Sequence, residues 1–377
     1  MISRNTNALL SIQAAVLRRA GSPLHIEPLE MEAPRDDEIL VKLLASGICH
    51  TDIGFWQSGG LGAVVLGHEG AGIVERVGKS VKSFRRGDHV VLSYQSCGHC
   101  RACKSGSPAN CAHFWDANFG FARLDGSNAL YPSKPTAGLL GTPLQASGVR
   151  GHFFGQSSFA SHCLATERNL VRVSKTLPLE LLAPLGCGLQ TGAGTVLNSL
   201  AVRRGASIAI FGTGSVGLAA VMAAHIAGAD PIIAVDIMPK RLALARELGA
   251  SHSIDSRKDD VAHRIAAITG SGIDYGVETS GDAALEQTAI ELLNPGGRLA
   301  LLTGGVGPGH LSGGRKVLSV IQGDAVPQQF IPKMIKLYRD GKFPIDRLVT
   351  FYDFHDINRA IADSLSGKTI KPVVRMV

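Results

Sequence analysis

The sequence predicts an α/β protein that combines a helix-covered parallel sheet with a second, β-rich module. After residue 188 the chain alternates between strand and helix patterns. Its strands at 207–211 and 232–236 are continuously apolar, as in a sheet buried on both faces. Residues 13–93 instead hold short alternating or β-branched runs bounded by Gly, Pro or Asp, which are typical of a small barrel. Two architectures therefore share one chain.

The elements of the two modules follow in order along the chain. Four extended runs are expected in the β-rich module, at 14–19, 38–46, 70–78 and 88–93. Between 94 and 155 the periodicity fades into a Gly/Pro/Ser-rich loop, and a loop of this length usually serves function or an interface. The parallel part continues through a strand at 251–256, a helix at 261–270, and strands at 272–280 and 297–305.

These changes of pattern divide the chain into three stretches, which are expected to form two domains. Residues 1–188 are expected to form the first part of the β-rich domain, with a metal-binding lobe at 94–112. Residues 189–326 are expected to form the nucleotide-binding domain. Residues 327–377 are expected to return to the first domain, since the last fifty residues resume a mixed α/β pattern.

Composition and charge exclude several classes of protein. The 377 residues are 45% hydrophobic and 18% charged, which excludes a disordered or collagen-like chain. No run approaches the roughly 18 apolar residues of a spanning helix, and the first residues lack the pattern of a signal peptide, so no membrane partner is expected. The net charge of +7 is spread along the chain rather than gathered on one stripe, which argues against nucleic acid and favours an anionic ligand such as a dinucleotide.

A glycine motif predicts a dinucleotide site. Gly212-Thr213-Gly214-Ser215-Val216-Gly217 has the form G-x-G-x-x-G, follows the strand 207–211 directly and opens a helix. Gly212 permits the tight turn, Gly214 admits a pyrophosphate, and Gly217 lets the helix pack on the strand. The free N–H groups at the helix N-terminus favour the anion, so Gly212, Gly214, Ser215, Val216 and Gly217 are the predicted cofactor contacts.

Asp236 closes the next strand, where the ribose-binding carboxylate of such a motif is expected. A carboxylate at this place accepts hydrogen bonds from the ribose hydroxyls and repels a 2′-phosphate. The sequence therefore favours NAD over NADP. The alternative is a glycine turn with a capping aspartate and no coenzyme.

The seven cysteines point to metal rather than to disulfides. Their number is odd, and four of them, Cys97, Cys100, Cys103 and Cys111, lie in one short segment. Four thiolates at this spacing suit a closed tetrahedral zinc site that stabilises structure, with an iron–sulfur cluster as the alternative. Thiol metal ligands are typical of a reducing compartment, so the cytoplasm is the expected location.

The remaining motifs, taken together, resemble those of a known protein family. Gly47-Ile48-Cys49-His50-Thr51-Asp52, Gly67-His68-Glu69-Gly70, the four-cysteine segment and Gly186-Cys187-Gly188 stand in this order before the glycine motif. The chain from 13 to 377 resembles the zinc-dependent medium-chain alcohol dehydrogenases. This resemblance implies a GroES-like catalytic domain around a Rossmann coenzyme domain (a doubly wound parallel sheet), with NAD and two zinc ions per chain. It also implies a catalytic zinc held by Cys49, His68 and Cys187, with a fourth position open to substrate.

The same resemblance assigns roles to the neighbouring residues. Asp52 would hold the His68 ring, and Glu69 would lie behind the metal as an occasional ligand. Thr51 would begin the proton relay, and His50 would lie near the pyrophosphate. Thr191 and Lys371 match coenzyme-contacting positions less specifically, and Cys163 matches no ligand and is expected in the core. Many relatives have a relay histidine three positions after Thr51, where this chain has Gly54.

The substrate that we expect is a primary aryl or allylic alcohol, oxidised to its aldehyde. Ser93 occupies a position that often holds a bulky aromatic residue in this family, and serine leaves space beside the zinc. Trp56 and Phe154 would line an apolar pocket, although both could be ordinary core residues. The alternatives are a dehydrogenase for short aliphatic alcohols or formaldehyde, and a zinc-ribbon binding module without catalysis.

By analogy with dimeric relatives, we expect a homodimer, with a homotetramer as the alternative. In such dimers the Rossmann sheet continues across a two-fold axis, here through the strand at 297–305, which leaves no exposed sheet edge. The loop at 112–150 resembles a segment that hinders tetramer packing in those relatives.

Overall fold

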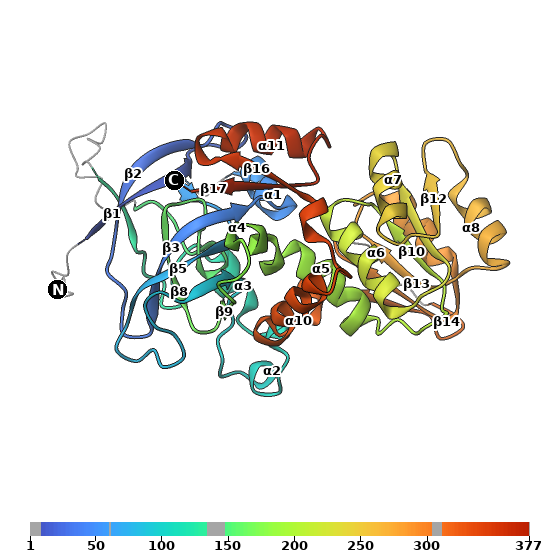
Figure 1. The fold of residues 1–377 in the computed structure, drawn as a ribbon, viewed down its shortest axis with the longest axis horizontal. Coiled ribbons are helices and arrows are strands. Elements are labelled where there is room, and N and C mark those ends of the chain that lie inside the picture. Colours follow the sequence, from blue (N-terminus) through green and yellow to red (C-terminus); the bar gives the residue numbers. More distant parts are fainter. Residues whose placement is uncertain (1–8, 60–61, 134–147, 304–310, 377) are drawn as a thin grey trace. The chain divides into compact units, whose positions relative to one another are not determined.

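The computed structural model describes residues 9–59, 62–133, 148–303 and 311–376, which divide into two units (Figure 1). The first unit comprises 1–106, 111–187 and 349–377, and the second comprises 107–110 and 188–348. The sequence predicts the return to the first unit at 327, whereas the structure places it at 349. The reason is helix α10 (Pro327–Arg339), which packs against α5 (Gly188–Gly194) of the second unit.

The first unit contains two β-sheets, as the β-rich pattern predicts. A seven-stranded sheet has the order β16-β17-β3-β5-β6-β9, with β8 paired to β3, and a four-stranded sheet has the order β4-β1-β2-β7. The strands are β1 (Leu10–Leu17), β2 (His25–Met31), β3 (Glu38–Gly47), β4 (Val64–Val65), β5 (Glu69–Val77), β6 (His89–Leu92), β7 (Leu130–Pro132), β8 (His162–Thr166), β9 (Leu170–Arg172), β16 (Val349–Asp353) and β17 (Lys371–Arg375). Its helices are α1 (His50–Ser58), α2 (Arg101–Lys104), α3 (Phe114–Phe119), α4 (Leu179–Leu182) and α11 (Ile357–Leu365).

Three neighbouring strands of the larger sheet position the residues discussed below. β3 lies between β5 and β17, and Gly47 at its end pairs with Glu69 on one side and with Val373 on the other. A side chain at position 47 would not fit, since a Cβ there would lie 2.1 Å from Glu69 Oε2. The chain leaves β3 through Cys49 into α1, so Cys49, Glu69 and the start of β17 meet at one end of this sheet.

The second unit is a parallel sheet with the strand order β12-β11-β10-β13-β14-β15, and every pairing in it is parallel. The order reverses between β10 and β13, as in doubly wound nucleotide-binding sheets. Its strands are β10 (Ile208–Phe211), β11 (Ile232–Asp236), β12 (His252–Asp255), β13 (Ile273–Glu278), β14 (Leu293–Leu301) and β15 (Lys316–Ser319). Its other helices are α6 (Ser215–Ala227), α7 (Pro239–Glu247), α8 (Val261–Thr269) and α9 (Ala283–Glu291).

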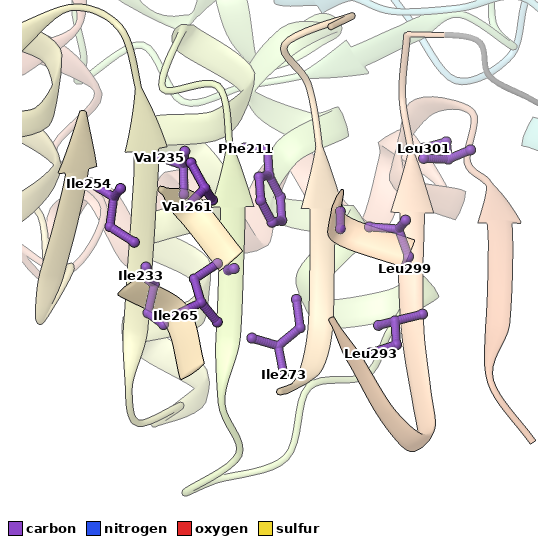
Figure 2. Close-up of a cluster of buried hydrophobic side chains, with 12 residues drawn as sticks. Phe211, Ile233, Val235, Ile254, Val261, Ile265, Ile273, Leu293, Leu299 and Leu301 are labelled. Atoms are coloured by element: carbon purple, nitrogen blue, oxygen red, sulfur yellow. The ribbon is translucent and has the colours of Figure 1, made fainter. Parts of the chain in front are cut away.

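Apolar side chains on one face of this sheet form a continuous core (Figure 2). Phe211, Ile233 and Leu299 come from three strands and are fully buried, and α8 adds Val261 and Ile265 to them. A strand that helices cover on both faces must be apolar at successive positions. This is why 207–211 and 232–236 are continuous runs of mainly apolar residues. The predicted class, a parallel doubly wound sheet with a β-rich domain, is confirmed.

One detail of the dimer prediction is wrong. The strand at 297–305 was expected at the edge of the sheet, but β14 lies between β13 and β15, and its Leu299 pairs with Val317 of β15. A sheet that continues into a second chain on this side would therefore use β15. Part of the predicted tetramer-hindering loop, 134–147, lies outside the described residues. Within the described part of the chain, no helix is long and apolar enough to cross a membrane.

His152 provides a test of how pH acts on this fold. Its burial, with the charges of Arg123 and Arg35, lowers its pKa to about 3, whereas an unfolded histidine has a pKa of about 6.5. Between these values only the unfolded chain binds the proton, so folding stability is lost as the pH falls from about 6.5 toward 3. We expect His152→Asn, which tolerates the positive φ of 58°, to flatten this slope by up to about 1.4 kcal/mol per pH unit.

Urea unfolding between pH 4 and pH 7 measures this slope. The exposed His252 of β12, changed to Asn, is the control and should leave the slope as it is. Equal slopes for wild type and His152→Asn would contradict the assignment.

Candidate active site

The structure brings together the three residues predicted to hold a catalytic metal. Cys49, His68 and Cys187, with Glu69, each offer one ligand atom within 4.8 Å of the others. Cys49 precedes α1, and His68 precedes β5. Cys187 follows the short 3₁₀ helix η4 (Ala183–Gly186). Residues far apart in sequence thus form one buried donor set of two sulfurs and one imidazole, which is one of the three-ligand sets that hold catalytic zinc.

Asp52 holds two of these ligands in place. Its Oδ1 lies 2.9 Å from His68 Nδ1 and accepts from the Gly67 N–H at 3.0 Å, and its Oδ2 accepts from the Cys49 N–H at 2.9 Å. A carboxylate facing Nδ1 keeps the proton there and leaves Nε2 as the donor atom. Among the described side chains, His68 Nε2 is buried without a hydrogen-bond partner, so the residues present fit a metal ion at this place.

The charges of the site also favour metal ligation. The hydrogen bond with Cys187 lowers the pKa of Cys49 well below its usual value; burial opposes this shift, and the nearby charge of Lys371 supports it. Burial disfavours a proton on His68, but the charge and hydrogen bond of Asp52 outweigh burial and raise its pKa to about 10. A metal that binds here must displace that proton, as metals do when they bind titratable ligands.

Glu69 and Lys371 form a buried ion pair behind the ligands. Lys371 Nζ lies 3.0 Å from both Glu69 oxygens and donates to the Ile48 carbonyl at 3.1 Å. Burial disfavours the ammonium charge, but Glu69 outweighs it and raises the pKa of Lys371. The resemblance predicts that Lys371 contacts the coenzyme. In the structure its donors face Glu69 and Ile48, and β17 places it 1% exposed inside the first unit, so the coenzyme contact stays a prediction.

Two polar residues brace the segments that carry the ligands. Ser93 donates to the carbonyl of Gly186, the residue before Cys187, at 2.6 Å. Gln156 donates to the carbonyls of His68 and Ser93 at 2.9 and 3.1 Å, and it accepts from the Gly70 N–H at 3.1 Å. The sequence analysis missed Gln156, since a single glutamine in a loop has no pattern that distinguishes it.

Aromatic rings surround His68 on two sides. Phe154 stacks on the imidazole with centroids 4.3 Å apart, and Phe153 meets it edge-on at 5.4 Å. Phe55, Phe119 and Phe121 each lie within 6.0 Å of the Phe153 ring, centroid to centroid. We call Phe55, Phe119, Phe121, Phe153 and Phe154 the phenylalanine cluster.

Of the two predicted pocket walls, the structure places only Phe154 in this cluster. Trp56 donates its indole N–H to the Ser22 carbonyl at 2.7 Å, and Phe55, one residue earlier, makes the ring contacts. Adjacent residues on a helix point in different directions, so a shift of one position, from Trp56 to Phe55, changes which ring faces the cluster. Phe119 and Phe121 lie in the segment that the sequence predicts as loop, where no periodicity identifies them.

The four-cysteine segment folds into a second donor set. Cys97, Cys100, Cys103 and Cys111 offer sulfurs within 4.8 Å of one another, with 4.0 Å between Cys97 and Cys103 and 3.9 Å between Cys100 and Cys111. Sulfurs bound to one tetrahedral zinc lie about 3.8 Å apart, so the spacing fits. Backbone N–H groups donating to the sulfur lower the pKa of Cys100 to about 6. Cys163 is fully buried on β8, away from both sets, and burial raises its pKa.

The glycine motif of the second unit has the geometry that a pyrophosphate requires. Gly212 has φ of +87°, and Gly214 is the N-cap of α6 with no atom within 4 Å of where a Cβ would be. A Cβ on Gly217 would lie 1.9 Å from the Gly212 carbonyl, so only glycine lets α6 pack this closely on β10. Open space above Gly214 and free N–H groups at Ser215 and Val216 suit an anion.

Asp236 closes β11 and fixes the same loop. Its Oδ2 accepts from the N–H and hydroxyl of Thr213 at 2.6 and 2.7 Å, and its Oδ1 accepts from the Met238 N–H at 2.8 Å. Thr191 is half-buried on α5 of this unit. In the first unit, His50 is exposed at the start of α1, and Thr51 Oγ1 lies 3.9 Å from Cys49 Sγ.

Comparisons with known proteins agree with this geometry. Residues 35–175 match the alcohol dehydrogenase GroES-like domain, and residues 215–331 match the zinc-binding dehydrogenase domain. The chain is 43% identical to geraniol dehydrogenase of Castellaniella defragrans, over 98% of this chain and 99% of that one. It is therefore a member of the zinc-dependent medium-chain alcohol dehydrogenase family, as the motifs predict, and an alcohol-oxidising oxidoreductase.

Two solved structures are similar over nearly the whole chain. A Burkholderia ambifaria protein described as an alcohol dehydrogenase zinc-binding domain protein has a TM-score of 0.91 at 49% identity, and covers 98% of this chain and 100% of its own. Benzyl alcohol dehydrogenase from Acinetobacter calcoaceticus has a TM-score of 0.89 at 41% identity, with the same coverage.

Proposed function

We propose that this enzyme oxidises primary aryl or allylic alcohols to aldehydes with NAD as hydride acceptor. The observation that carries the proposal is the phenylalanine cluster, which surrounds a metal ligand with flat apolar rings. Flat unsaturated substrates pack well against such rings, which add about 0.5–1.5 kcal/mol per aromatic pair. Two similar proteins are described as a geraniol and a benzyl alcohol dehydrogenase, which supports the same substrate class.

Each of the site residues in the first unit has a separate role in the proposed reaction. Zinc held by Cys49, His68 and Cys187 would supply Lewis acidity toward the alcohol oxygen. Asp52 orients the imidazole of His68 and the backbone of Cys49, and Lys371 holds Glu69 close to the ligands in its charged form. Thr51, whose hydroxyl lies beside Cys49, would begin the proton relay: its oxygen accepts the proton of the substrate hydroxyl while its own hydroxyl proton passes on toward solvent. Four thiolates, Cys97, Cys100, Cys103 and Cys111, would hold a second zinc that stabilises their segment.

The test is a screen of NADH formation with benzyl, cinnamyl, geranyl and ethyl alcohols. We expect kcat/KM for the unsaturated alcohols to exceed that for ethanol by about 100-fold or more, since each buried apolar group adds discrimination. Phe55→Ala should narrow this ratio, and the neighbouring Trp56→Ala, which lies outside the phenylalanine cluster, is the matched control. Preference for ethanol over the three unsaturated alcohols would refute the substrate class and favour the alternative dehydrogenase of short aliphatic alcohols.

Asp236 tests the coenzyme assignment. We expect Asp236→Gly to lower kcat/KM for NAD about tenfold and the NAD-to-NADP ratio by still more, because the carboxylate both binds the ribose hydroxyls and repels a 2′-phosphate. Thr213→Ala is the control, since it removes one hydrogen bond of the loop and leaves the charge of Asp236. An unchanged ratio in Asp236→Gly would remove this role.

Gly54 tests the proton relay. Gly54 is exposed on α1, and a Cβ there would meet nothing within 4 Å, so the backbone leaves room for a side chain to begin there. We expect Gly54→His to raise kcat for alcohol oxidation about three- to tenfold at pH 7 and to have little effect at pH 9.5, where hydroxide in solvent takes the proton. Gly54→Gln, which adds a similar volume without a base, is the control. An unchanged kcat at pH 7 would show that proton removal is not limiting.

The assembly and location that we propose are a homodimer and the cytoplasm. Among the described strands, β15 is the last of the parallel sheet, which supports a two-fold contact there, since an edge strand favours pairing with another chain. Sedimentation velocity measures the assembly. A monomer at micromolar concentration would refute both the dimer and the tetramer.

A further inference from the structure

Two histidines lie beside the four-cysteine segment without belonging to its donor set. His99 stands between Cys97 and Cys100, and His113 follows Cys111. Their ring centroids are 5.7 Å apart, and both side chains are exposed. Together with Cys97 Sγ, each offers a ligand atom within 4.8 Å of the others. The four thiolates already complete a tetrahedral site, so that site does not need His99 or His113 as a ligand.

The two imidazoles are held in a geometry that suits a metal. His99 Nδ1 lies 2.9 Å from the Cys97 carbonyl, so its N–H donates there and Nε2 remains as the ligand atom. The His113 backbone is anchored by its N–H, which donates to Cys111 Sγ at 3.4 Å. Asp116 Oδ2 lies 3.9 Å from His113 Nδ1 and adds a negative charge. Rings held this close need little reorganisation to bind one ion.

We propose that His99 and His113 form an exposed binding site for a divalent transition-metal ion at the edge of the four-cysteine segment, next to Cys97. Imidazole with a neighbouring thiolate and carboxylate favours borderline ions such as Zn²⁺, Ni²⁺ and Cu²⁺ over Mg²⁺ or Ca²⁺, which prefer oxygen. The site is separate from the Cys49 centre, and the proposal does not depend on the proposed reaction.

Equilibrium dialysis of the metal-loaded enzyme against Ni²⁺ tests the site. We expect one Ni²⁺ per chain with no release of zinc, and at least tenfold weaker binding in His99→Gln and in His113→Gln. His263→Gln, which removes an exposed histidine of α8 in the second unit, is the matched control and should bind as the wild type does. Trp115 gives a second readout, because its side chain is 67% exposed on α3, two residues from His113, and bound Ni²⁺ should quench its emission.

Three outcomes would overturn the proposal. They are the absence of bound Ni²⁺, equal binding by the double variant His99→Gln/His113→Gln, and uptake only in exchange for zinc. The last would place Ni²⁺ in the four-cysteine set instead. Activity toward alcohols is measured in parallel, and since neither histidine belongs to the Cys49 centre, a failure of the substrate proposal leaves this result unaffected.

Discussion

Replacing Cys49 with serine is expected to lower kcat/KM for alcohol oxidation by about a thousandfold or more, which corresponds to about 4 kcal/mol of transition-state stabilisation. The cause is loss of one of three ligands, since a serine hydroxyl is not ionised at neutral pH and does not replace a thiolate. The fold should survive, because the second donor set, Cys97, Cys100, Cys103 and Cys111, is a separate cluster. Measurement of kcat/KM, zinc content and Tm on the same sample should show activity lost, zinc reduced from two ions to one, and a small change in Tm.

The control is Cys163→Ala, a change at a buried cysteine outside both donor sets. It should keep two zinc ions and full activity even where it lowers Tm. If Cys49→Ser retained two zinc ions and substantial activity, the two-site assignment would be wrong. A wild-type chain with a single zinc and no turnover would favour the binding-module alternative.

Lys371→Met is expected to destabilise the first unit by about 3–5 kcal/mol. Glu69 is fully buried, and removal of the ammonium group leaves its charge in the interior without this compensation. The free energy of unfolding in urea measures the effect. Zinc content should fall as well, since the charge of Lys371 helps to keep Cys49 ionised.

Two further variants separate the charge from the packing at this position. Lys371→Arg keeps the positive charge and should recover most of the stability. Lys368→Met, three residues earlier, removes a surface pair with Asp363 and should change stability little. If Lys371→Met were as stable as the wild type, the buried pair would not contribute to folding.

The elements of the fold could be predicted because each depends on local pattern. The strand Ile232–Asp236 is apolar up to its last residue, which predicts burial on both faces, and Gly212, with its positive φ, permits the turn before α6. The short motifs around Cys49, His68 and Cys187 likewise carry the resemblance that predicts these residues as ligands, and the structure brings their ligand atoms within 4.8 Å of one another. In each case the information lies within a few neighbouring residues.

The supporting contacts could not be predicted, because they depend on how distant segments meet. The Lys371–Glu69 pair joins residues 302 positions apart and requires the register of β17 on β3 and of β3 on β5. Gln156 and Phe55 depend in the same way on which atoms face them in the folded chain. The return to the first unit at 349 was missed because the composition of α10 does not show that it packs on α5.

The two donor sets differ in when they can form as the chain is synthesised. All four thiols of residues 97–111 leave the ribosome together, so that segment can capture zinc while translation continues. The Cys49 centre needs Cys187, and the ion pair of Glu69 with Lys371 forms only once β17 has emerged. The donor set is therefore complete once Cys187 has emerged, but the buried ion pair behind it forms only after nearly the whole chain has been made. When zinc is scarce during synthesis, the cysteine segment is thus expected to fill before the Cys49 centre has its third ligand.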